Sequence, residues 1–240
     1  MPPSYHIGCS GYHYRHWRGV FYPDKLPMRR WFEHYSQHFR TLELNVTFYR
    51  FPQRSFLENW YAQSPADFQF AVKAPRLITH YKQFHRVQPQ LDDFYLTLAQ
   101  GLREKLGPVL FQLPPRLVYD AARLTRILDC IDPAFANVLE FRHPSWWREE
   151  VYAGLRQRGV TFCGQSHPLL PETVVATAPT LYYRFHGVPD LYASPYDEAT
   201  LQRLAAELRA APGVGQAYLY FNNDIGGSAI GNAQRLREIL

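Results

Sequence analysis

Short apolar segments alternate with longer amphipathic segments from one end of the chain to the other, and this pattern constrains the fold most. The predicted strands are residues 5–10, 41–45, 68–73, 109–112, 138–142, 160–165, 181–186 and 217–222. The predicted helices are residues 29–39, 54–64, 91–106, 121–131, 147–158, 197–211 and 229–240. A strand followed by a helix, repeated about eight times, is typical of a parallel sheet built from βαβ units. The connection between residues 165 and 181 is a poor helix, so we expect one degenerate unit after the sixth strand.

Side-chain parity within these strands distinguishes a closed barrel from an open, doubly wound sheet. Successive residues of a strand point to opposite faces, and in the fifth strand Leu139 and Phe141 oppose Glu140 and Arg142. The same division recurs in most of the other strands, where the second face becomes polar toward the C-terminal end. A doubly wound sheet has helices on both faces and needs apolar residues on both. The pattern predicts one TIM-type (β/α)8 barrel over residues 1–240, with a polar mouth at the strand C-termini.

Charge and cysteine content indicate the environment of the chain. A formal net charge of +5 favours anionic partners such as phosphate, carboxylate or nucleic acid. Its three cysteines are far apart in the sequence, which predicts a reducing compartment and argues against disulfides or a thiolate metal site. The sequence shows no leader and no apolar run of the roughly 18 residues that a membrane span needs. We therefore expect a cytoplasmic protein that does not bind membranes.

Short polar and aromatic motifs follow most of the predicted strands. They are Gly8-Cys9-Ser10-Gly11-Tyr12, Glu43-Leu44-Asn45, Phe70-Ala71-Val72-Lys73, Gln112-Leu113-Pro114-Pro115, Glu140-Phe141-Arg142-His143, Tyr183-Arg184-Phe185-His186-Gly187 and Phe221-Asn222-Asn223-Asp224. In this order they resemble the domain-of-unknown-function 72 family, the YecE-like proteins, over essentially the whole chain. The resemblance implies a TIM-type barrel and no particular reaction, because none is assigned to the family. The chain departs from the family after the sixth strand, where Gln165-Ser166-His167-Pro168 replaces an acidic residue near a proline.

Polar residues of the inner face gather at the predicted barrel mouth. They are Ser10, Glu43, Asn45, Lys73, Gln112, Glu140, Arg142, Gln165, Arg184, His186 and Asn222. Two glutamates, Glu43 and Glu140, stand against Lys73, Arg142 and Arg184, so two negative and three positive charges leave about +1. Buried charges need a partner or a ligand. One interpretation is a structural network that pairs Glu140 with Arg142 or Arg184 and Glu43 with Lys73, and the other is an anion-binding site.

The anion-site interpretation gives each residue type a role. The predicted ligand-binding residues are Lys73, Arg142, Arg184, Asn45, Asn222, Tyr12 and Trp17, and the predicted catalytic residues are Glu140, His186 and Glu43. Guanidinium groups bind phosphate or carboxylate bidentately, an ammonium adds a point charge, and amides orient the ligand. His186 would act as a general acid or base near neutral pH, and Glu140 would hold Arg142 or act as a base.

Two loops at the same end of the barrel carry further candidates. The loop after the first strand is rich in rings, namely Tyr12, Tyr14, His16, Trp17, Phe21 and Tyr22. Such rings stack on bases or sugars, or pack as a lid. The segment after the third strand is basic, with Arg76, His80, Lys82, His85 and Arg86, which suits a polyanion or forms a solvated loop.

Three functions remain open from the sequence, and whether the chain is an enzyme is one of the open questions. The first is binding of a phosphorylated or other anionic ligand, nucleic acid included, with phosphoester hydrolysis as a reaction. A metal-assisted version would use Glu43, Glu140 and His186, but no H-x-H spacing supports it and we assign neither metal ligands nor a cofactor. The second is glycoside hydrolysis by the two glutamates, which fails if arginines clamp both and lower their pKa values. The third is non-enzymatic anion binding.

Overall fold

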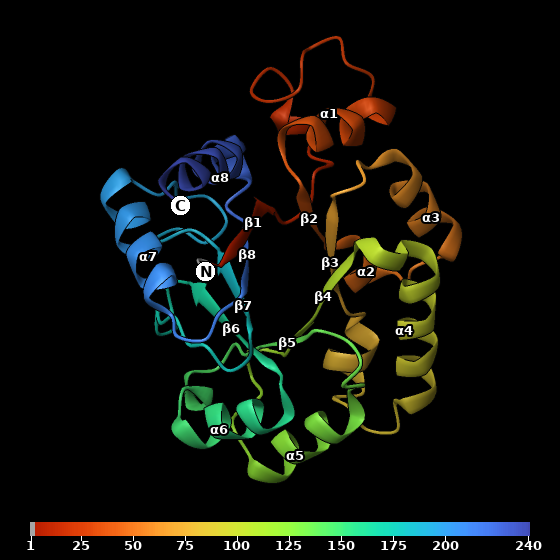
Figure 1. Ribbon diagram of the computed structural model, residues 1–240, viewed down its shortest axis with the longest axis vertical. Helices are drawn as coiled ribbons and strands as arrows, with labels where there is room; N and C mark the ends of the chain where they lie inside the picture. The colour runs from red at the N-terminus through yellow and green to blue at the C-terminus, as the bar shows by residue number, and fades with distance from the viewer. Residues whose placement is uncertain (1–2) are drawn as a thin grey trace.

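Eight parallel strands form the wall of a barrel in the computed structural model, which describes residues 3–240. The strands are β1 (Ser4–Cys9), β2 (Thr41–Leu44), β3 (Gln69–Lys73), β4 (Leu106–Gln112), β5 (Asn137–Glu140), β6 (Thr161–Ser166), β7 (Thr180–Phe185) and β8 (Gln216–Phe221). Their order in the sheet is β1-β8-β7-β6-β5-β4-β3-β2, so all adjacent strands except β1 and β8 are also consecutive in the sequence. Figure 1 shows the strands as a ring surrounded by helices. The predicted TIM-type fold is confirmed.

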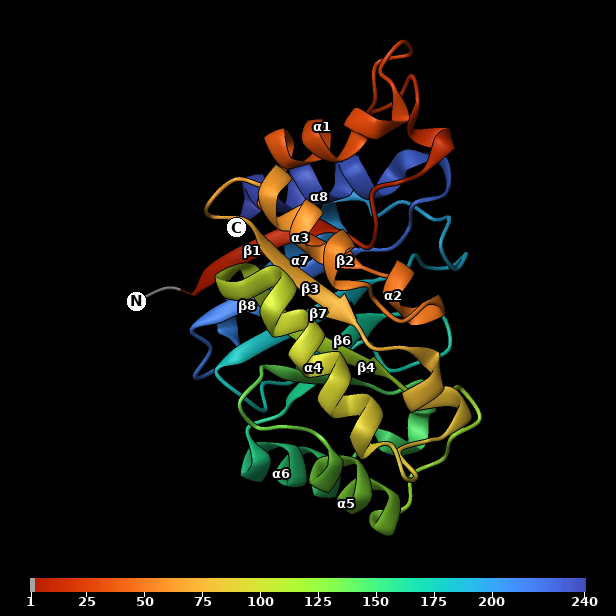
Figure 2. The same cartoon turned by 90° about the vertical axis from the view of Figure 1, so that its right-hand side faces the viewer.

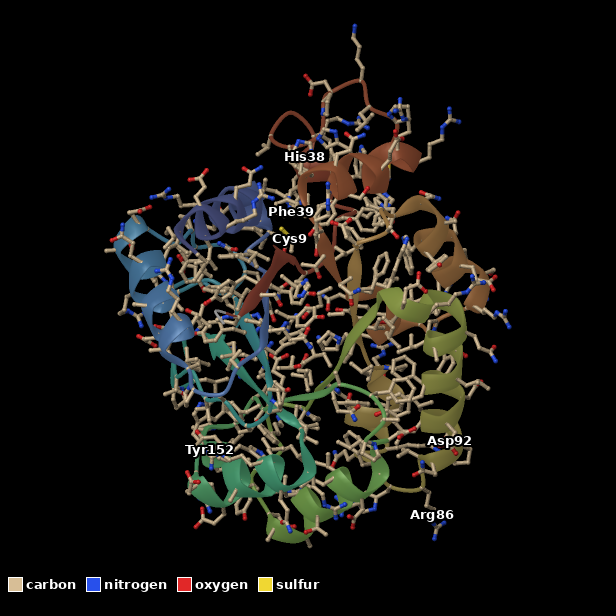
Figure 3. The ribbon with its side chains drawn as sticks, in the orientation of Figure 1. Cys9, His38, Phe39, Arg86, Asp92 and Tyr152 are labelled. Atoms are coloured by element: carbon tan, nitrogen blue, oxygen red, sulfur yellow. The ribbon has the colours of Figure 1, made fainter. Side chains whose placement is uncertain are left out.

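The barrel closes between β1 and β2 with help from a side chain. An isolated bridge joins Ser10 to Glu43, just beyond the end of β1. Below it the Tyr35 hydroxyl accepts a hydrogen bond from the Cys9 N–H and donates one to the Thr41 carbonyl, each at 2.9 Å. Both backbone groups are therefore satisfied through a side chain at this point of the junction. Figure 3 shows Cys9 at this junction, near Phe39 at the end of the first helix.

The helices lie outside the ring of strands. They are α1 (Trp31–His38), α2 (Val46–Tyr49), α3 (Arg54–Gln63), α4 (Gln88–Leu102), α5 (Ala121–Cys130), α6 (Glu149–Arg158), α7 (Glu198–Ala210) and α8 (Ser228–Ile239). Asp120 and Asp197 cap α5 and α7 by accepting hydrogen bonds from backbone N–H groups of the first turn. No helix lies between β6 and β7 in the described part of the chain, which confirms the expected degenerate unit.

The core has two layers, and they follow the predicted parity. The outer layer lies between strands and helices and includes Leu139 and Phe141 of the fifth predicted strand. The inner layer fills the lumen with Ala71, Leu110, Val138, Cys163, Tyr182, Tyr218 and Tyr220. Side chains crowd the space inside the ring in Figure 3. The lumen is therefore a packed core in its lower part, as in other barrels of this type.

The strands all end on the same side of the barrel, which is the right-hand side of Figure 2. The short helix α2 and the loop that follows β1 lie on this side, opposite the first described residues of β1. Because the strands are parallel, the polar residues at their C-terminal ends meet here. This end of the barrel is the mouth.

Candidate functional site

A buried ion-pair layer, formed by Glu43, Glu140, Tyr182 and Arg184, lies across the lumen just below the mouth. Nη2 of Arg184 is 2.6 Å from Oε1 of Glu43, and its Nη1 is 2.8 Å from Oε2 of Glu140. The Tyr182 hydroxyl donates to the other oxygen of Glu43 at 2.6 Å. All four side chains are fully buried. Both terminal nitrogens of Arg184 are thus engaged by carboxylates of the protein and cannot bind a ligand as a fork, while its buried Nε has no partner among residues 3–240.

The pairing differs in one respect from the network considered from the sequence. Glu43 pairs with Arg184 rather than with Lys73, because Arg184 of β7 reaches the centre of the lumen between β2 and β5. Burial alone would raise the pKa of Glu140, but the guanidinium groups of Arg142 and Arg184 together hold it well below its usual range. Glu140 is therefore ionised at neutral pH. Since arginine contacts both glutamates, the arrangement counts against glycoside hydrolysis by this pair.

His186 lies above this layer and is enclosed by protein groups. Its Nε2 is 3.0 Å from Nη2 of Arg142 and 3.2 Å from Oε1 of Glu140, and its Nδ1 is 3.1 Å from Nδ2 of Asn222. Nε of Arg142 is itself 2.5 Å from Oε1 of Glu140. Burial, followed by the charges of Arg142 and Arg184, lowers the pKa of His186 well below its usual range. The imidazole is neutral at pH 7, and both of its nitrogens already have partners.

A cavity of about 400 Å³ opens above these side chains at the mouth. Its polar lining comes from residues at or near the ends of β2, β3, β5, β7 and β8 and from the loop after β1. These residues include Tyr14, Asn45, Lys73, Arg142, Arg184, Asn222 and Asp224. The mouth cavity therefore brings together most of the residues that the sequence predicts to bind a ligand.

Lys73, the last residue of β3, is the cation of this cavity that is not engaged by a carboxylate. Its side chain is 8% exposed, and Nζ lies 4.4 Å from the centre of the Phe48 ring. Within residues 3–240 its ammonium forms no ion pair, because Arg184 takes Glu43 and shares Glu140 with Arg142. Burial, and then the nearby charge of Arg184, lower the pKa of Lys73 to about 7. A substantial fraction of Lys73 is therefore an unprotonated amine at neutral pH.

Lys105 is a second buried lysine, and it provides a contrast. It is 5% exposed and lies at the opposite end of the barrel, just before β4. Its Nζ donates hydrogen bonds to the carbonyls of Tyr61 and Ser64 and to the Ser64 hydroxyl, at 2.8 to 2.9 Å. All three ammonium hydrogens are therefore used. Lys73 has a similar degree of burial and no comparable set of acceptors.

Asp224 contributes a carboxyl group to the mouth cavity that sequence reasoning did not single out. Burial raises its pKa, and its Oδ2 lies 3.8 Å from Nε2 of His16. The Asp224 carbonyl accepts a hydrogen bond from Nε1 of Trp17 at 3.2 Å. Asp224 lies three residues beyond β8, outside the strand alternation on which the inner set was chosen. Its place in the motif with Asn222 was the available signal. Tyr182 was also missed, although its parity pointed inward.

The aromatic loop after β1 packs against the barrel. Trp17 is fully buried and lies outside the mouth cavity, so its ring is not available to stack on a ligand there. Tyr12 lines a neighbouring cavity of about 230 Å³ together with His13 and Trp60. Nε1 of Trp60 donates a hydrogen bond to the Tyr12 hydroxyl at 3.1 Å. Asn45 lines both cavities, and its buried Oδ1 has no hydrogen-bond partner within the described residues.

The basic loop after β3 lies outside the lining of the mouth cavity. Arg76 lies 5.7 Å from the ring centre of Tyr49 and 5.4 Å from that of Tyr81. The Lys82 ammonium donates to the Arg86 carbonyl at 3.3 Å. Figure 3 shows Arg86 pointing outward from the edge of the molecule. These cations are therefore dispersed over the surface rather than directed into the mouth cavity.

The remaining predicted donors do not form a metal centre. Gln165 turns its amide to the Phe141 carbonyl at 2.7 Å and lies outside the lining of the mouth cavity. Across residues 3–240 there is no group of three or more histidine, cysteine, aspartate or glutamate side chains placed to hold a metal ion. Of the donors considered for such a site, Glu43 and Glu140 are engaged by arginines.

Comparison with known proteins places the chain in a family. The model of the family described as "Protein of unknown function DUF72" matches residues 6–240. The chain is a member of the DUF72 family. This confirms the resemblance that its motifs show. UPF0759 protein YunF of Bacillus subtilis (strain 168) is 27% identical to this DUF72 protein, over 91% of the chain and 89% of the relative. UPF0759 protein YecE of Escherichia coli (strain K12) is 31% identical, over 53% of the chain and 49% of the relative.

Solved structures of the same family share the fold of this DUF72 protein. A DUF72 family protein from Thermotoga maritima superposes with a TM-score of 0.89 at 28% identity, covering 98% of each chain. A DUF72 family protein from Enterococcus faecalis gives a TM-score of 0.81 at 17% identity, covering 99% of this chain and 97% of the other. Among the helices formed by residues 3–240, none has the length and apolar character needed to cross a membrane.

Proposed function

We propose that this DUF72 protein binds a small molecule bearing a phosphate or carboxylate group in the mouth cavity, with Lys73 as the principal contact. The observation that carries the proposal is the unpaired ammonium of a lysine that is 8% exposed. A cation held in this way loses hydration without gaining a counter-ion, and an anionic ligand would supply one. Asn45 and Asn222, which line the same cavity, would orient the ligand.

The layer below supports the choice of ligand class. Glu43 and Glu140 balance Arg142 and Arg184, so two negative and two positive charges cancel there. Lys73 is then the cation of the cavity that no carboxylate of that layer balances, and Asp224 is the carboxyl group in the same lining. A single small anion fits this arrangement better than a polyanion, which would need several cations spaced along an open groove.

The proposal covers binding and leaves hydrolysis out. Both glutamates are held by arginine, and His186 is neutral with both nitrogens engaged. None of these three predicted catalytic side chains has a free proton-transfer position that faces the cavity. The anion-binding part of the sequence interpretation therefore has more support than phosphoester or glycoside hydrolysis.

Calorimetric titration with inorganic phosphate tests the proposal. We expect Lys73→Met to weaken phosphate binding at pH 6.5 at least tenfold. Lys82→Met removes the same charge from the basic loop after the same strand, and it should bind phosphate like the unmodified protein. Binding should also weaken as the pH rises above 7, because only the protonated form of Lys73 attracts the anion.

Two results would overturn this function. One is phosphate binding by Lys73→Met with unchanged affinity, provided that its circular dichroism spectrum shows a folded barrel. The other is loss of binding in Lys82→Met but not in Lys73→Met. In that case a short oligonucleotide, titrated in parallel, would show whether the basic loop binds a polyanion instead.

A further inference from the structure

We propose that Lys73 is a nucleophilic amine, which forms an imine with a small carbonyl compound bound in the mouth cavity. The inference rests on the anion site proposed above and names its substrate class more closely. The compound would carry a carbonyl group next to, or a few bonds from, a carboxylate or phosphate. A 2-oxo acid and a phosphorylated ketone are the two simplest examples.

The position of the amine is the first support. Lys73 ends β3 at the mouth of a parallel barrel, which is where enzymes of this architecture place their reacting groups. Nζ adjoins the face of the Phe48 ring at 4.4 Å and borders a cavity of about 400 Å³, enough for a ligand of several non-hydrogen atoms. The reacting nitrogen thus has an apolar contact on one side and open space on the other.

The groups around Lys73 favour its unprotonated form. Burial and the positive charges of Arg184 and Arg142 act against the ammonium, while Glu140 and Glu43 act for it. The two arginines also hold those glutamates in ion pairs, so neither carboxylate forms an ion pair with Nζ. Desolvation together with a neighbouring cation is a known way to activate a lysine as a nucleophile. The buried ion-pair layer thereby favours the nucleophilic, unprotonated form of Lys73 above it.

Lys105 shows that a buried lysine does not necessarily have a free amine. It is as buried as Lys73, yet its three hydrogen bonds to Tyr61 and Ser64 require the ammonium form and occupy every hydrogen. It has no free lone pair and no comparable cavity to face. The chain has four lysines in all, Lys25, Lys73, Lys82 and Lys105, so the other three serve as internal references.

The proposed reaction balances without an oxidant or reductant. The lone pair of Nζ attacks the carbonyl carbon and forms a C–N bond, while the C=O π electrons move to oxygen. A proton passes from nitrogen to that oxygen and gives a carbinolamine. The C–O bond then breaks as the oxygen accepts a second proton and leaves as water, and the nitrogen lone pair completes a protonated imine. Asp224, the carboxyl group in the cavity lining, is the candidate for supplying the second proton, and burial raises its pKa.

Reductive trapping on the full chain tests the inference. The protein is incubated at pH 7 with pyruvate or dihydroxyacetone phosphate and sodium cyanoborohydride, and the modified lysine is identified by peptide mass spectrometry. We expect Lys73 to be labelled at least tenfold faster than Lys25, Lys82 or Lys105. An exposed lysine with an ordinary pKa has less than about one part in a thousand of its amine unprotonated at this pH. Excess inorganic phosphate should slow the labelling of Lys73 only.

Lys73→Arg separates this inference from the proposed function. An arginine keeps the positive charge but cannot form an imine, so phosphate binding should persist while trapping is lost. Asp224→Asn should slow trapping several-fold without abolishing phosphate binding. If unmodified protein binds phosphate through Lys73 yet labels Lys73 no faster than Lys25, the imine is wrong and the anion site stands. If labelling of Lys73 is fast but insensitive to phosphate, the anionic substrate class is wrong.

Discussion

Two polar layers lie one above the other in the same lumen, and they differ in whether their buried charges have partners of opposite charge. In the buried ion-pair layer, Arg184 bridges Glu43 and Glu140, and Tyr182 satisfies a further carboxylate oxygen. At the mouth, Lys73 is nearly as buried but has no carboxylate partner within the described chain. Within the described chain, both carboxylates of the lower layer have a cationic partner, whereas the ammonium of the upper layer has no anionic partner.

The difference separates charges that hold the barrel together from charges available to a ligand. Arginine suits the first task because its planar fork contacts two carboxylates at once and stays ionised when buried. Lysine suits the second because its pKa shifts readily on burial. We therefore centre the proposed site on Lys73 and the residues around the cavity rather than on Glu43, Glu140 and Arg184.

Removing the centre of the lower layer should have the largest effect. Arg184→Met would leave Glu43 and Glu140 buried without their shared counter-ion. We expect it to reduce the free energy of unfolding by about 3–5 kcal/mol, the cost of breaking a buried pair from one side. Urea denaturation followed by circular dichroism measures the change.

The matched control is Arg235→Met, which removes an arginine that also contacts two glutamates, but on the surface. Its effect should be much smaller, because exposed pairs gain little in water. Equal losses in the two variants would mean that the lower layer does not stabilise the barrel through its burial.

Removing the cation of the upper layer should raise the free energy of unfolding instead of lowering it. Lys73→Met removes a buried cation without a partner, so the variant should be more stable than the unmodified protein at pH 6. The pKa of Lys73 falls from 10.5 in the unfolded chain to about 7 on folding. The unfolded chain therefore binds more protons between these values, and the penalty of Lys73 is full below pH 7 and disappears as the pH rises toward 10.5. The advantage of the variant should shrink by about 1.4 kcal/mol per pH unit above 7.

Thermal or urea unfolding at pH 6, 7.5 and 9 measures the stability difference between the variant and the unmodified protein at three pH values. Lys105→Met is the control, and it should lower stability because the acceptors of Tyr61 and Ser64 lose their donor. A Lys73→Met variant that is less stable at pH 6, like Lys105→Met, would mean that Lys73 has a stabilising partner and that the charges of both layers are balanced within the protein.

The sequence was sufficient to predict which residues face the lumen but not how they pair. Parity has a period of two in every strand, so one apolar face identifies the other as the inner wall. Pairing depends on the register between the strands, which sets the level of each side chain along the barrel axis. This register brings Arg184 to Glu43 across 141 positions of sequence. The sequence does not give that level, and it therefore left Glu43 with Lys73 as one possible pair. Asp224 was missed for a related reason, since it lies beyond the strand where parity no longer applies.

His186 lies between the two layers and provides the smallest and most selective test. Its pKa is well below 6.5 in the folded protein. On acidification the unfolded chain therefore binds a proton at this residue that the folded protein does not bind. Stability should therefore fall as the pH drops below 6.5, by up to about 1.4 kcal/mol per unit from this residue. His186→Gln should be less stable than the unmodified protein at pH 7.5, and the gap should narrow by about 2 kcal/mol at pH 5. Asn222→Ala removes a contact of the same ring but keeps the imidazole, so its gap should stay constant between these pH values. A constant gap for His186→Gln as well would show that the imidazole binds its proton equally well in the folded and the unfolded protein, so that burial and the neighbouring arginines do not hold the ring neutral.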